Sequence, residues 1–477
     1  MKRFFLVLFS SVILYSSWAQ TYSVEELTRA SQQFMSARNP ELTIRATDTL
    51  LADSNLVVGF LFRFAPKGFV IVSFFDNIRP IYGYSVTDNF LFQGNDGRLA
   101  RKLISKDLQY RIWSADLLPR DSRIEIAREW ELFKAGVLFG NPFQQWPPEG
   151  TTITGGWLNT NWTQSAPYNT MCPMDLNAGS RSVAGCPAIA MAQIVNYHED
   201  INNTLFDDSD DYYHNYGAGN QYWIDNDHET WGFPSFDSLN TWLESLGYAY
   251  QCHLPVSNEM KAALCFASGI AAHQVYSASV SGTFGIEQAY EAFQRFDFAE
   301  SRLAYPTDTN LNYDIAENMK VALPVQLGLI CDPGPGGHNV VVDGYNTYEY
   351  YHFNFGWGGS ANGWYTLPPT GIPYNLTIIE GAVLDIKSDN FTSDQVFNID
   401  SLPIRLYPNP VISDLFIQSR LPHASLILYN SAGKRIHDVP IDRPVKKLSL
   451  DQLTPGLYFI HVIQHNHVIF TGKIIKK

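Results

Sequence analysis

The chain has 477 residues, 45% of them hydrophobic and 17% charged, with a formal net charge of −14. This length accommodates about three domains of ordinary size. The negative balance argues against nucleic acid as a partner, because phosphate binding requires a basic surface. The five cysteines are too few for a disulfide scaffold, form no CxxC pair and have no histidine at zinc-finger spacing. We therefore expect neither a metal site nor another cofactor.

Residues 1–19 are predicted to form a secretory signal peptide. Lys2 and Arg3 give a basic start, an apolar stretch follows, and small residues precede Gln20. The apolar stretch is shorter than the ~20 residues that a membrane-spanning helix needs. We therefore expect an exported protein, either secreted or held at the cell surface.

Residues 20–140 are predicted to form an α+β domain without catalytic groups. Ser23 is a candidate helix N-cap with Glu26 three residues further on, and strand-like apolar runs follow. No histidine or cysteine occurs between residues 20 and 171. A structural or inhibitory role is expected for this domain, and the segment 141–156, rich in Pro and Gly, is expected to be an exposed, cleavable linker.

All five cysteines lie in residues 157–385, which is where we expect the chemistry. Cys186 stands between Gly185 and Pro187, at the start of a run of good helix formers. The N-terminus of a helix stabilises a thiolate through its free N–H groups and its dipole, and Pro suits the first helical turn. Cys186 is therefore a candidate nucleophile, with a structural buried cysteine as the alternative.

His338 is the candidate general base. It follows two glycines, which let a substrate backbone approach closely, and it begins a strand-like run 152 residues after Cys186. Asn354 is a candidate to accept a hydrogen bond from the far ring nitrogen and to hold the tautomer. Trp357 is a candidate to shield that contact from water. Asp343 is a rival to Asn354, although "VDGY" is more typical of a turn.

Gln164, about twenty residues before the cysteine, is a candidate to donate to an oxyanion beside the backbone N–H of Cys186. The ordered segments "QSAPYN", "AGCPAIAMAQIVNYH", "GGHNVVVDGY" and "HFNFGWGG" together resemble the streptopain family of papain-fold cysteine peptidases over roughly residues 155–385. The resemblance implies an α+β, two-lobed papain-like fold. It also implies Cys186 as nucleophile, His338 as general base and Gln164 in the oxyanion hole.

The same resemblance suggests which residues line the substrate site. By position these are Gly337 and the loop 279–285, with Ser281 and Gly282. The sequence departs from the family at Phe355, where a tryptophan is usual. Both Asn354 and an aromatic neighbour therefore remain candidates for orienting the histidine, and Phe355 is expected to contribute only by packing.

The flanking segments resemble known segments as well. Residues 20–140 resemble the inhibitory propeptide of these enzymes. Beyond a linker at 386–403, residues 404–477 contain short alternating runs separated by turn signals, which predict a small antiparallel β-sandwich. The "YPNP" and "PGLYFIHV" stretches resemble the C-terminal sorting domain of the type IX secretion system.

The sequence therefore favours a secreted cysteine endopeptidase that is made as a zymogen and cleaves peptide bonds through a thioester intermediate. The expected partners are protein or peptide substrates, its own propeptide as an intramolecular inhibitor, and the type IX secretion machinery. The alternatives are a papain-like amidase or acyltransferase acting on cell-wall peptides, and a non-catalytic surface adhesin.

An odd number of cysteines leaves at least one thiol free. We expect Cys186 to be unpaired, whereas Cys172 has Cys252, Cys265 and Cys331 as potential disulfide partners.

Overall fold

The computed structural model describes residues 21–90, 94–136, 143–216, 220–330, 337–370 and 373–388, and in the tail residues 404–407, 411–419, 424–430, 433–441, 445–464 and 467–477. The predicted signal peptide and most of the predicted linker 386–403 lie outside these residues. The chain divides into two compact units, Met1–Asn390 and Phe391–Lys477. Within the described residues, none of the helices combines the length and apolar character that a membrane span requires.

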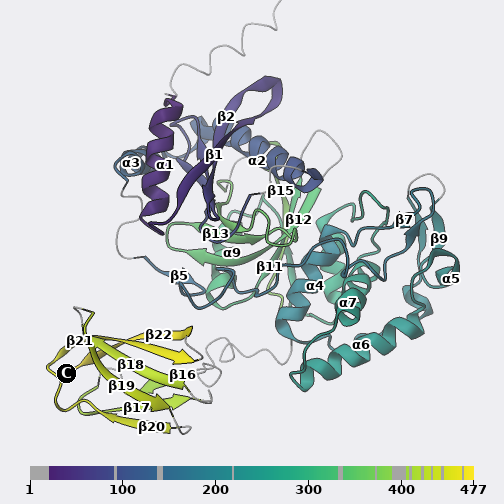
Figure 1. Ribbon diagram of the computed structural model, residues 1–477. Helices are drawn as coiled ribbons and strands as arrows, with labels where there is room; N and C mark the ends of the chain where they lie inside the picture. The colour runs from purple at the N-terminus through teal and green to yellow at the C-terminus, as the bar shows by residue number, and fades with distance from the viewer. Residues whose placement is uncertain are drawn as a thin grey trace, which may run out of the picture. The chain divides into compact units, whose positions relative to one another are not determined.

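Among the described residues, eleven strands form one antiparallel sheet through the first unit (Figure 1). Their order is β1-β2-β3-β4-β14-β13-β12-β11-β15-β10, and β5 pairs with β12. The N-terminal region, residues 21–136, supplies β1 (Thr43–Leu51), β2 (Val57–Ala65), β3 (Phe69–Ser73) and β4 (Ile81–Ser85). The later strands are β5 (Gln145–Trp146), β10 (Arg302–Ala304), β11 (Val325–Ile330), β12 (Gly337–Asn346), β13 (Tyr350–Asn354), β14 (Gly363–Thr366) and β15 (Ile379–Leu384).

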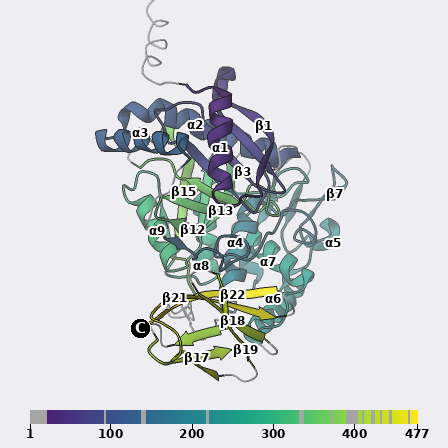
Figure 2. The same ribbon diagram turned by 60° about the vertical axis from the view of Figure 1, so that its left-hand side comes forward.

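The N-terminal region also contains three long helices (Figure 2). They are α1 (Val24–Ser36), α2 (Gly94–Ser114) and α3 (Arg120–Lys134), with the short 3₁₀ helices η1 (Asp53–Asn55) and η2 (Ala115–Leu117). The Ser23 hydroxyl accepts from the Glu26 N–H and the Glu26 carboxylate accepts from the Ser23 N–H, so the predicted capping box starts α1. The sequence did not predict α2, because its first turn consists of residues typical of turns, "GNDG".

Helix α4 (Cys186–His198) is the centre of the helical part of the first unit (Figure 1). Nine consecutive residues of this helix, 187–195, are buried. A helix that is buried on all sides needs small or apolar side chains all round, and the sequence of α4 provides them. It packs against α7 on one side and β12 on the other. The other helices are α5 (His228–Trp231), α6 (Phe236–Gln251), α7 (Asn258–Ala271), α8 (Ile286–Arg295) and α9 (Leu311–Lys320), with η3 (Asp208–Asp210) and η4 (Tyr374–Leu376).

Two small hairpins complete the described part of the helical region. They are β6 (Met174–Asp175) with β7 (Ser180–Arg181), and β8 (Tyr213–Asn215) with β9 (Gln221–Trp223). The predicted mixture of helices with antiparallel strands is therefore confirmed for the described residues of the first unit.

The N-terminal region shares its sheet and its core with the rest of the first unit. Strand β4 pairs with β14, with Tyr84 opposite Trp364 and Gly83 opposite Tyr365; we call this pairing the seam. One buried cluster combines side chains of β2, β3 and α2 with side chains of β11–β15. A second cluster combines α1 and α3 with Tyr350 and Trp364. This region is therefore packed as part of the unit.

The described part of the tail forms two antiparallel sheets around a core of its own. One sheet contains β16 (Ile404–Tyr407), β17 (Asp414–Ser419) and β20 (Val445–Ser449). The other contains β18 (Ala424–Asn430), β19 (Arg435–Ile441), β21 (Gly456–Gln464) and β22 (His467–Lys476). Leu415 and Ile417 of the first sheet and Leu428 and Ile460 of the second belong to one buried cluster. Two sheets around one core make a sandwich.

Candidate active site

Cys186 is the first residue of α4, and a tight turn delivers the chain to it. Gly185 has φ of 86°, a conformation that favours glycine, and a Cβ there would lie 2.4 Å from Oε1 of Gln274. The Gln274 amide donates to the carbonyl of Ala184 at 2.8 Å, and this hydrogen bond holds the turn in place. Pro187 costs the helix nothing at this position, because the first-turn N–H groups have no partner within the helix.

The thiol of Cys186 is free and partly exposed. Burial of the sulfur raises the pKa of Cys186 to about 11, and the carboxylate of Asp96 in the first turn of α2 acts in the same direction. The backbone N–H groups of Asn339 and Cys186 oppose this rise. In this state the sulfur is therefore a neutral thiol at pH 7, while the donors that would stabilise a thiolate are already in place.

His338 lies near the start of β12 and is buried. Its Nε2 is 2.8 Å from the carbonyl oxygen of Phe355. Because a carbonyl only accepts, Nε2 carries the proton and Nδ1 is left as the basic nitrogen. The ring stacks on Trp357 with the centroids 4.3 Å apart. Burial lowers the pKa of His338 to about 4, so the ring is neutral at pH 7.

The fold brings the segments that carry Cys186 and His338 together. Helix α4 packs on β12, and the N–H of Asn339, the residue after His338, is directed at the Cys186 sulfur. The hydrogen bonds of the described residues include none between the thiol and the imidazole. The arrangement supplies a nucleophile at a helix N-terminus and a base on the adjacent strand.

Asn354 makes its hydrogen bonds away from His338. Its side-chain nitrogen donates to the carbonyl of Thr160 at 2.8 Å, and its side-chain oxygen accepts from the N–H of Gly356 at 3.0 Å. The partner of the far ring nitrogen of His338 is the main-chain carbonyl of Phe355. Phe355 thus contributes a hydrogen bond as well as packing, which no side-chain pattern in the sequence reveals.

The segment containing Gln164 lies beside the turn that leads to Cys186. The carbonyl of Gln164 accepts from the N–H of Ala184 at 2.9 Å, and the Gln164 side chain is half-buried. Two residues earlier, the carbonyl of Trp162 accepts from the N–H of Gly358 at 3.0 Å. This segment therefore connects the loop that follows Trp357 with the start of α4.

The loop 279–285 is tied to the same turn. The carbonyl of Ser277 accepts from the N–H of Val183 at 3.1 Å, and the Ser281 hydroxyl accepts from the N–H of Ser277 at 3.1 Å. Gly282 and Val275 exchange two backbone hydrogen bonds. A Cβ on Gly282 would meet no atom within 4 Å, so this side of the loop is open.

Gly337 immediately precedes the histidine in β12. A Cβ at this position would lie 2.9 Å from the carbonyl oxygen of Leu329 on β11. The glycine therefore permits close pairing of the two strands at the point where His338 enters the site.

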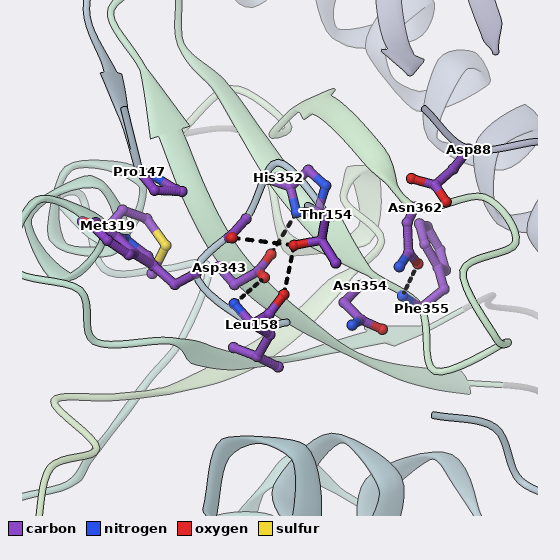
Figure 3. Close-up of polar contacts among 12 residues, drawn as sticks. Asp88, Pro147, Thr154, Leu158, Met319, Asp343, His352, Asn354, Phe355 and Asn362 are labelled. Atoms are coloured by element: carbon purple, nitrogen blue, oxygen red, sulfur yellow. Dashed lines mark hydrogen bonds and ion pairs between the residues drawn. The ribbon is translucent and has the colours of Figure 1, made fainter. Parts of the chain in front are cut away.

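Asp343 pairs with a different histidine. Its carboxylate contacts Nδ1 of buried His352 at 2.6 Å and accepts from the N–H of Leu158 at 3.0 Å (Figure 3). The predicted turn at "VDGY" is wrong, because these residues continue β12 and the register with β13 shifts between Val342 and Gly344. Asp343 occupies a β-bulge, which aims its side chain at the chain entering the middle segment.

The sequence did not single out two further residues that shape the site. Gln274 holds the turn before Cys186. The one sign of it in the sequence is Gly185, since a larger residue there would collide with the Gln274 side chain. Asn362 accepts from the N–H of Phe355 at 2.9 Å and so holds in place the residue whose carbonyl binds His338 (Figure 3). Asn362 carries no recognisable signal, since it lies in a short turn after the aromatic motif.

The other described cysteines are not paired. Cys172 and Cys265 are buried and Cys252 is exposed, all as free thiols. The Cys172 disulfides with Cys252 or Cys265 that the sequence left open are therefore absent, whereas Cys331 lies outside the described residues. Within the parts of the chain that the structure describes, no group of three or more His, Cys, Asp or Glu side chains is placed to hold a metal ion.

Two family models match the chain. Residues 162–365 match the Peptidase C10 family, and residues 405–477 match the secretion system C-terminal sorting domain. The resemblance of the middle segment to the streptopain family is thus confirmed, as is the sorting domain. The sorting domain indicates export through the type IX secretion system to the cell surface or the extracellular space.

Curated relatives match part of the chain. Streptopain of Streptococcus pyogenes is 23% identical over 227 residues, which cover 43% of this chain and 53% of streptopain. The thiol protease/hemagglutinin PrtT of Porphyromonas gingivalis is 26% identical over 212 residues, covering 42% of this chain and 22% of that protein. The chain thus spans about half the length of the streptopains that it matches.

Two solved structures from Prevotella intermedia are also similar. A prointerpain A fragment aligns with 17% identity and a TM-score of 0.46, covering 72% of this chain and 100% of that one. The active interpain A cysteine protease aligns with 21% identity and a TM-score of 0.36, covering 49% of this chain and 94% of that one.

Proposed function

We propose, from the Peptidase C10 family domain that the chain contains, that this protein is a secreted cysteine endopeptidase that hydrolyses proteins. The observation that carries the proposal is the pair formed by Cys186 and His338. The first begins a helix beside a backbone N–H of the strand that carries the second, and the second has its far nitrogen bound to a carbonyl, which leaves Nδ1 basic. In this proposal the helical part around α4 and the sheet part around β12 are the two lobes of a papain-like fold.

The chemistry follows from these positions. Nδ1 of His338 takes the thiol proton, and the Cys186 sulfur attacks the substrate carbonyl carbon. The oxyanion receives hydrogen bonds from the N–H of Cys186 and the side-chain amide of Gln164. The imidazolium then protonates the leaving amine as the C–N bond breaks. Water, deprotonated by His338, attacks the thioester, and the thiol and the carboxylic acid are released.

The N-terminal region acts in this proposal as an inhibitory propeptide, 20–140. Supporting this role, the Asp96 carboxylate raises the Cys186 pKa together with burial, which favours the unreactive thiol.

The segment 141–156 is the proposed cleavage zone. The expectation that the whole segment is exposed is wrong, because Gln145–Trp146 pair with β12 and Thr154 is buried. The exposed residues are 148–151 and Ile153, which is 80% exposed, and exposed loops are where proteases cut.

The test compares the wild-type chain with Cys186→Ala and His338→Ala, each incubated with casein under reducing conditions. We expect the wild type to digest casein once cleavage within 141–156 has separated the N-terminal region, and both variants to be at least about 10³-fold slower, as expected for a nucleophile and its base. Cys252→Ala is the matched control, because Cys252 is an exposed free thiol, and it should retain full activity.

Two outcomes would overturn the proposal. Equal casein digestion by the wild type and Cys186→Ala would remove the cysteine from the chemistry. A wild type that leaves casein intact but releases ammonia from, or transfers acyl groups between, cell-wall peptides would replace the endopeptidase with an amidase or acyltransferase.

A further inference from the structure

We propose that Gln193 is a positioning residue for the catalytic centre. Its buried amide joins the three chain segments that carry the nucleophile, the oxyanion donor and the carbonyl that holds the base. This inference rests on the proposed peptidase function, but it concerns a residue that contacts neither substrate nor reacting atoms.

Gln193 lies seven residues after Cys186 in α4, which is about two helical turns, so both side chains project from the same face of the helix. The residue is fully buried. A buried amide on that face has to find its partners in the elements packed against the helix, because burying it without hydrogen bonds is costly.

The Gln193 side-chain oxygen gathers donors from two other segments. It accepts from the Thr160 hydroxyl at 2.9 Å and from the N–H of Trp162 at 3.2 Å. It also accepts from the side-chain nitrogen of Asn354 at 3.3 Å. The first two donors belong to the segment that continues directly to Gln164, and the third lies at the end of β13.

Asn354 links Gln193 to the carbonyl that binds His338. Its oxygen accepts from the N–H of Gly356 at 3.0 Å, and its nitrogen also donates to the carbonyl of Thr160. The peptide that joins Phe355 to Gly356 contains both this N–H and the Phe355 carbonyl, which is 2.8 Å from Nε2 of His338. The position of that carbonyl therefore depends on Asn354, and the position of Asn354 depends on Gln193.

The connection matters because the three catalytic groups come from distant parts of the sequence. Gln164, Cys186 and His338 meet only through the packing of separate segments, and a catalytic group displaced by about 1 Å loses on the order of 10²-fold in rate. Removing the Gln193 amide leaves the buried N–H of Trp162 and the Asn354 amide without one acceptor. These groups then have to move to find another partner.

The experiment compares the full chain with Gln193→Met, which keeps the length of the side chain and removes its hydrogen bonds. Gln294→Met is the matched control. The Gln294 amide on α8 donates to the Ser301 hydroxyl at 2.8 Å and to the carbonyls of Phe298 and Ser301, which lie outside the three catalytic segments. Thermal unfolding, casein hydrolysis, kcat and KM on a peptide substrate, and the rate of Cys186 alkylation against pH are measured for all three proteins.

We expect Gln193→Met to lower kcat about 10- to 100-fold with KM nearly unchanged. The alkylation profile should shift to higher pH, because a displaced His338 moves the adjacent N–H of Asn339, which then stabilises the thiolate less well. Gln294→Met should retain the wild-type kcat and alkylation profile, whatever its unfolding temperature. If Gln193→Met lowers the unfolding temperature but matches Gln294→Met in kcat and in the alkylation profile, the residue is merely structural and the inference fails.

A second variant keeps the inference testable if Gln193→Met does not fold. Thr160→Val removes one donor to the same oxygen at a half-buried position and should lower kcat in the same direction, by about 2- to 5-fold; an unchanged kcat would contradict the inference. Failure of the proposed function is recognised separately, because casein would then resist the wild type while the pH dependence of Cys186 alkylation still reports on Gln193.

Discussion

The two segments that flank the Peptidase C10 domain are attached to the protein in opposite ways. The N-terminal region extends the central sheet through the seam between β4 and β14 and contributes side chains to two shared buried clusters. The tail has two sheets and a buried cluster of its own, and it falls in a separate compact unit. This difference fits the roles proposed for the two segments, because an inhibitory propeptide would have to pack onto the peptidase whereas a sorting domain would have to fold by itself.

Glycines make the seam close. A Cβ on Gly83 would lie 2.4 Å from the ring of Tyr365, and a Cβ on Gly363 would lie 2.6 Å from the carbonyl of Tyr84. Beside it, Arg111 of α2 donates to the hydroxyl and to the carbonyl of Thr366, both at 2.7 Å. These contacts join the N-terminal region to the catalytic part by packing and by a buried charge.

The largest expected difference between the two flanks follows from deleting residues 391–477. Export should be lost, because the sorting domain is removed. The free energy of unfolding of the first unit should change by no more than about 0.5 kcal/mol, as expected for independent parts. Cell fractionation and thermal unfolding measure the two effects, and a markedly destabilised first unit would show that the tail is not independent.

Arg111→Met should strongly weaken the attachment of the N-terminal region. Arg111 and Asp107 form a buried ion pair at 2.7 Å with almost no exposure. Removing one partner of such a pair costs about 3–5 kcal/mol, because the other charge remains buried. Denaturant unfolding of the precursor measures this loss.

Two further variants separate the buried charge from mere loss of a side chain. The double variant Asp107→Leu/Arg111→Met should recover much of the stability, since no unpaired charge remains. Arg302→Met removes two ion pairs, to Asp314 and Asp385, of an arginine that is 45% exposed, and should cost at most about 1 kcal/mol for each pair. Equal losses of unfolding free energy in Arg111→Met and Arg302→Met would show that the buried charge of Arg111 stabilises the precursor no more than an exposed one.

Alkylation of Cys186 should respond to one flank and not to the other. With a pKa of about 11, about one thiol in 10⁴ is ionised at pH 7, whereas an unperturbed cysteine near 8.5 is ionised to a few per cent. Because burial raises this pKa, exposing the sulfur lowers it and increases the thiolate. Loss of the N-terminal region removes the Asp96 carboxylate, which raises this pKa, and should accelerate alkylation at pH 7 by up to about 100-fold.

The tail-deleted chain is the control for this measurement, and it should be alkylated at the rate of the intact precursor. Equal rates before and after loss of the N-terminal region would contradict the account of the thiol.

The smallest expected effect is that of Gly83→Ala at the seam. The added methyl group would press on the Tyr365 ring, and overpacking of this kind costs about 1–3 kcal/mol. Gly247→Ala in α6 is the control, because its Cβ would meet only Ile201 at an ordinary 3.4 Å. That substitution should stabilise the protein by up to about 1 kcal/mol. Denaturant unfolding of both variants decides whether the seam is as tight as described.

The sequence predicted those features that depend on a few neighbouring side chains. Ser23 with Glu26 predicted the start of α1, and the glycine and proline around Cys186 predicted the start of α4. Both depend on a few neighbouring residues. The combined signals of the middle segment and the tail also predicted their families correctly.

What the sequence did not predict depends on contacts between distant segments. The acceptor for His338 is a main-chain carbonyl, which every residue possesses and no motif marks. Asp343 was considered for His338, but the β-bulge directs it to His352. The seam joins residues about 280 positions apart, and its only sign is glycine in two strands.

The most direct test of the central claim is one time course on the purified full chain under reducing conditions, in which chain mass and casein hydrolysis are measured together. The account predicts that hydrolysis is absent while residues 21–136 remain attached and rises in step with cleavage between residues 141 and 156. Full hydrolysis by the intact chain, before any cleavage, would contradict it.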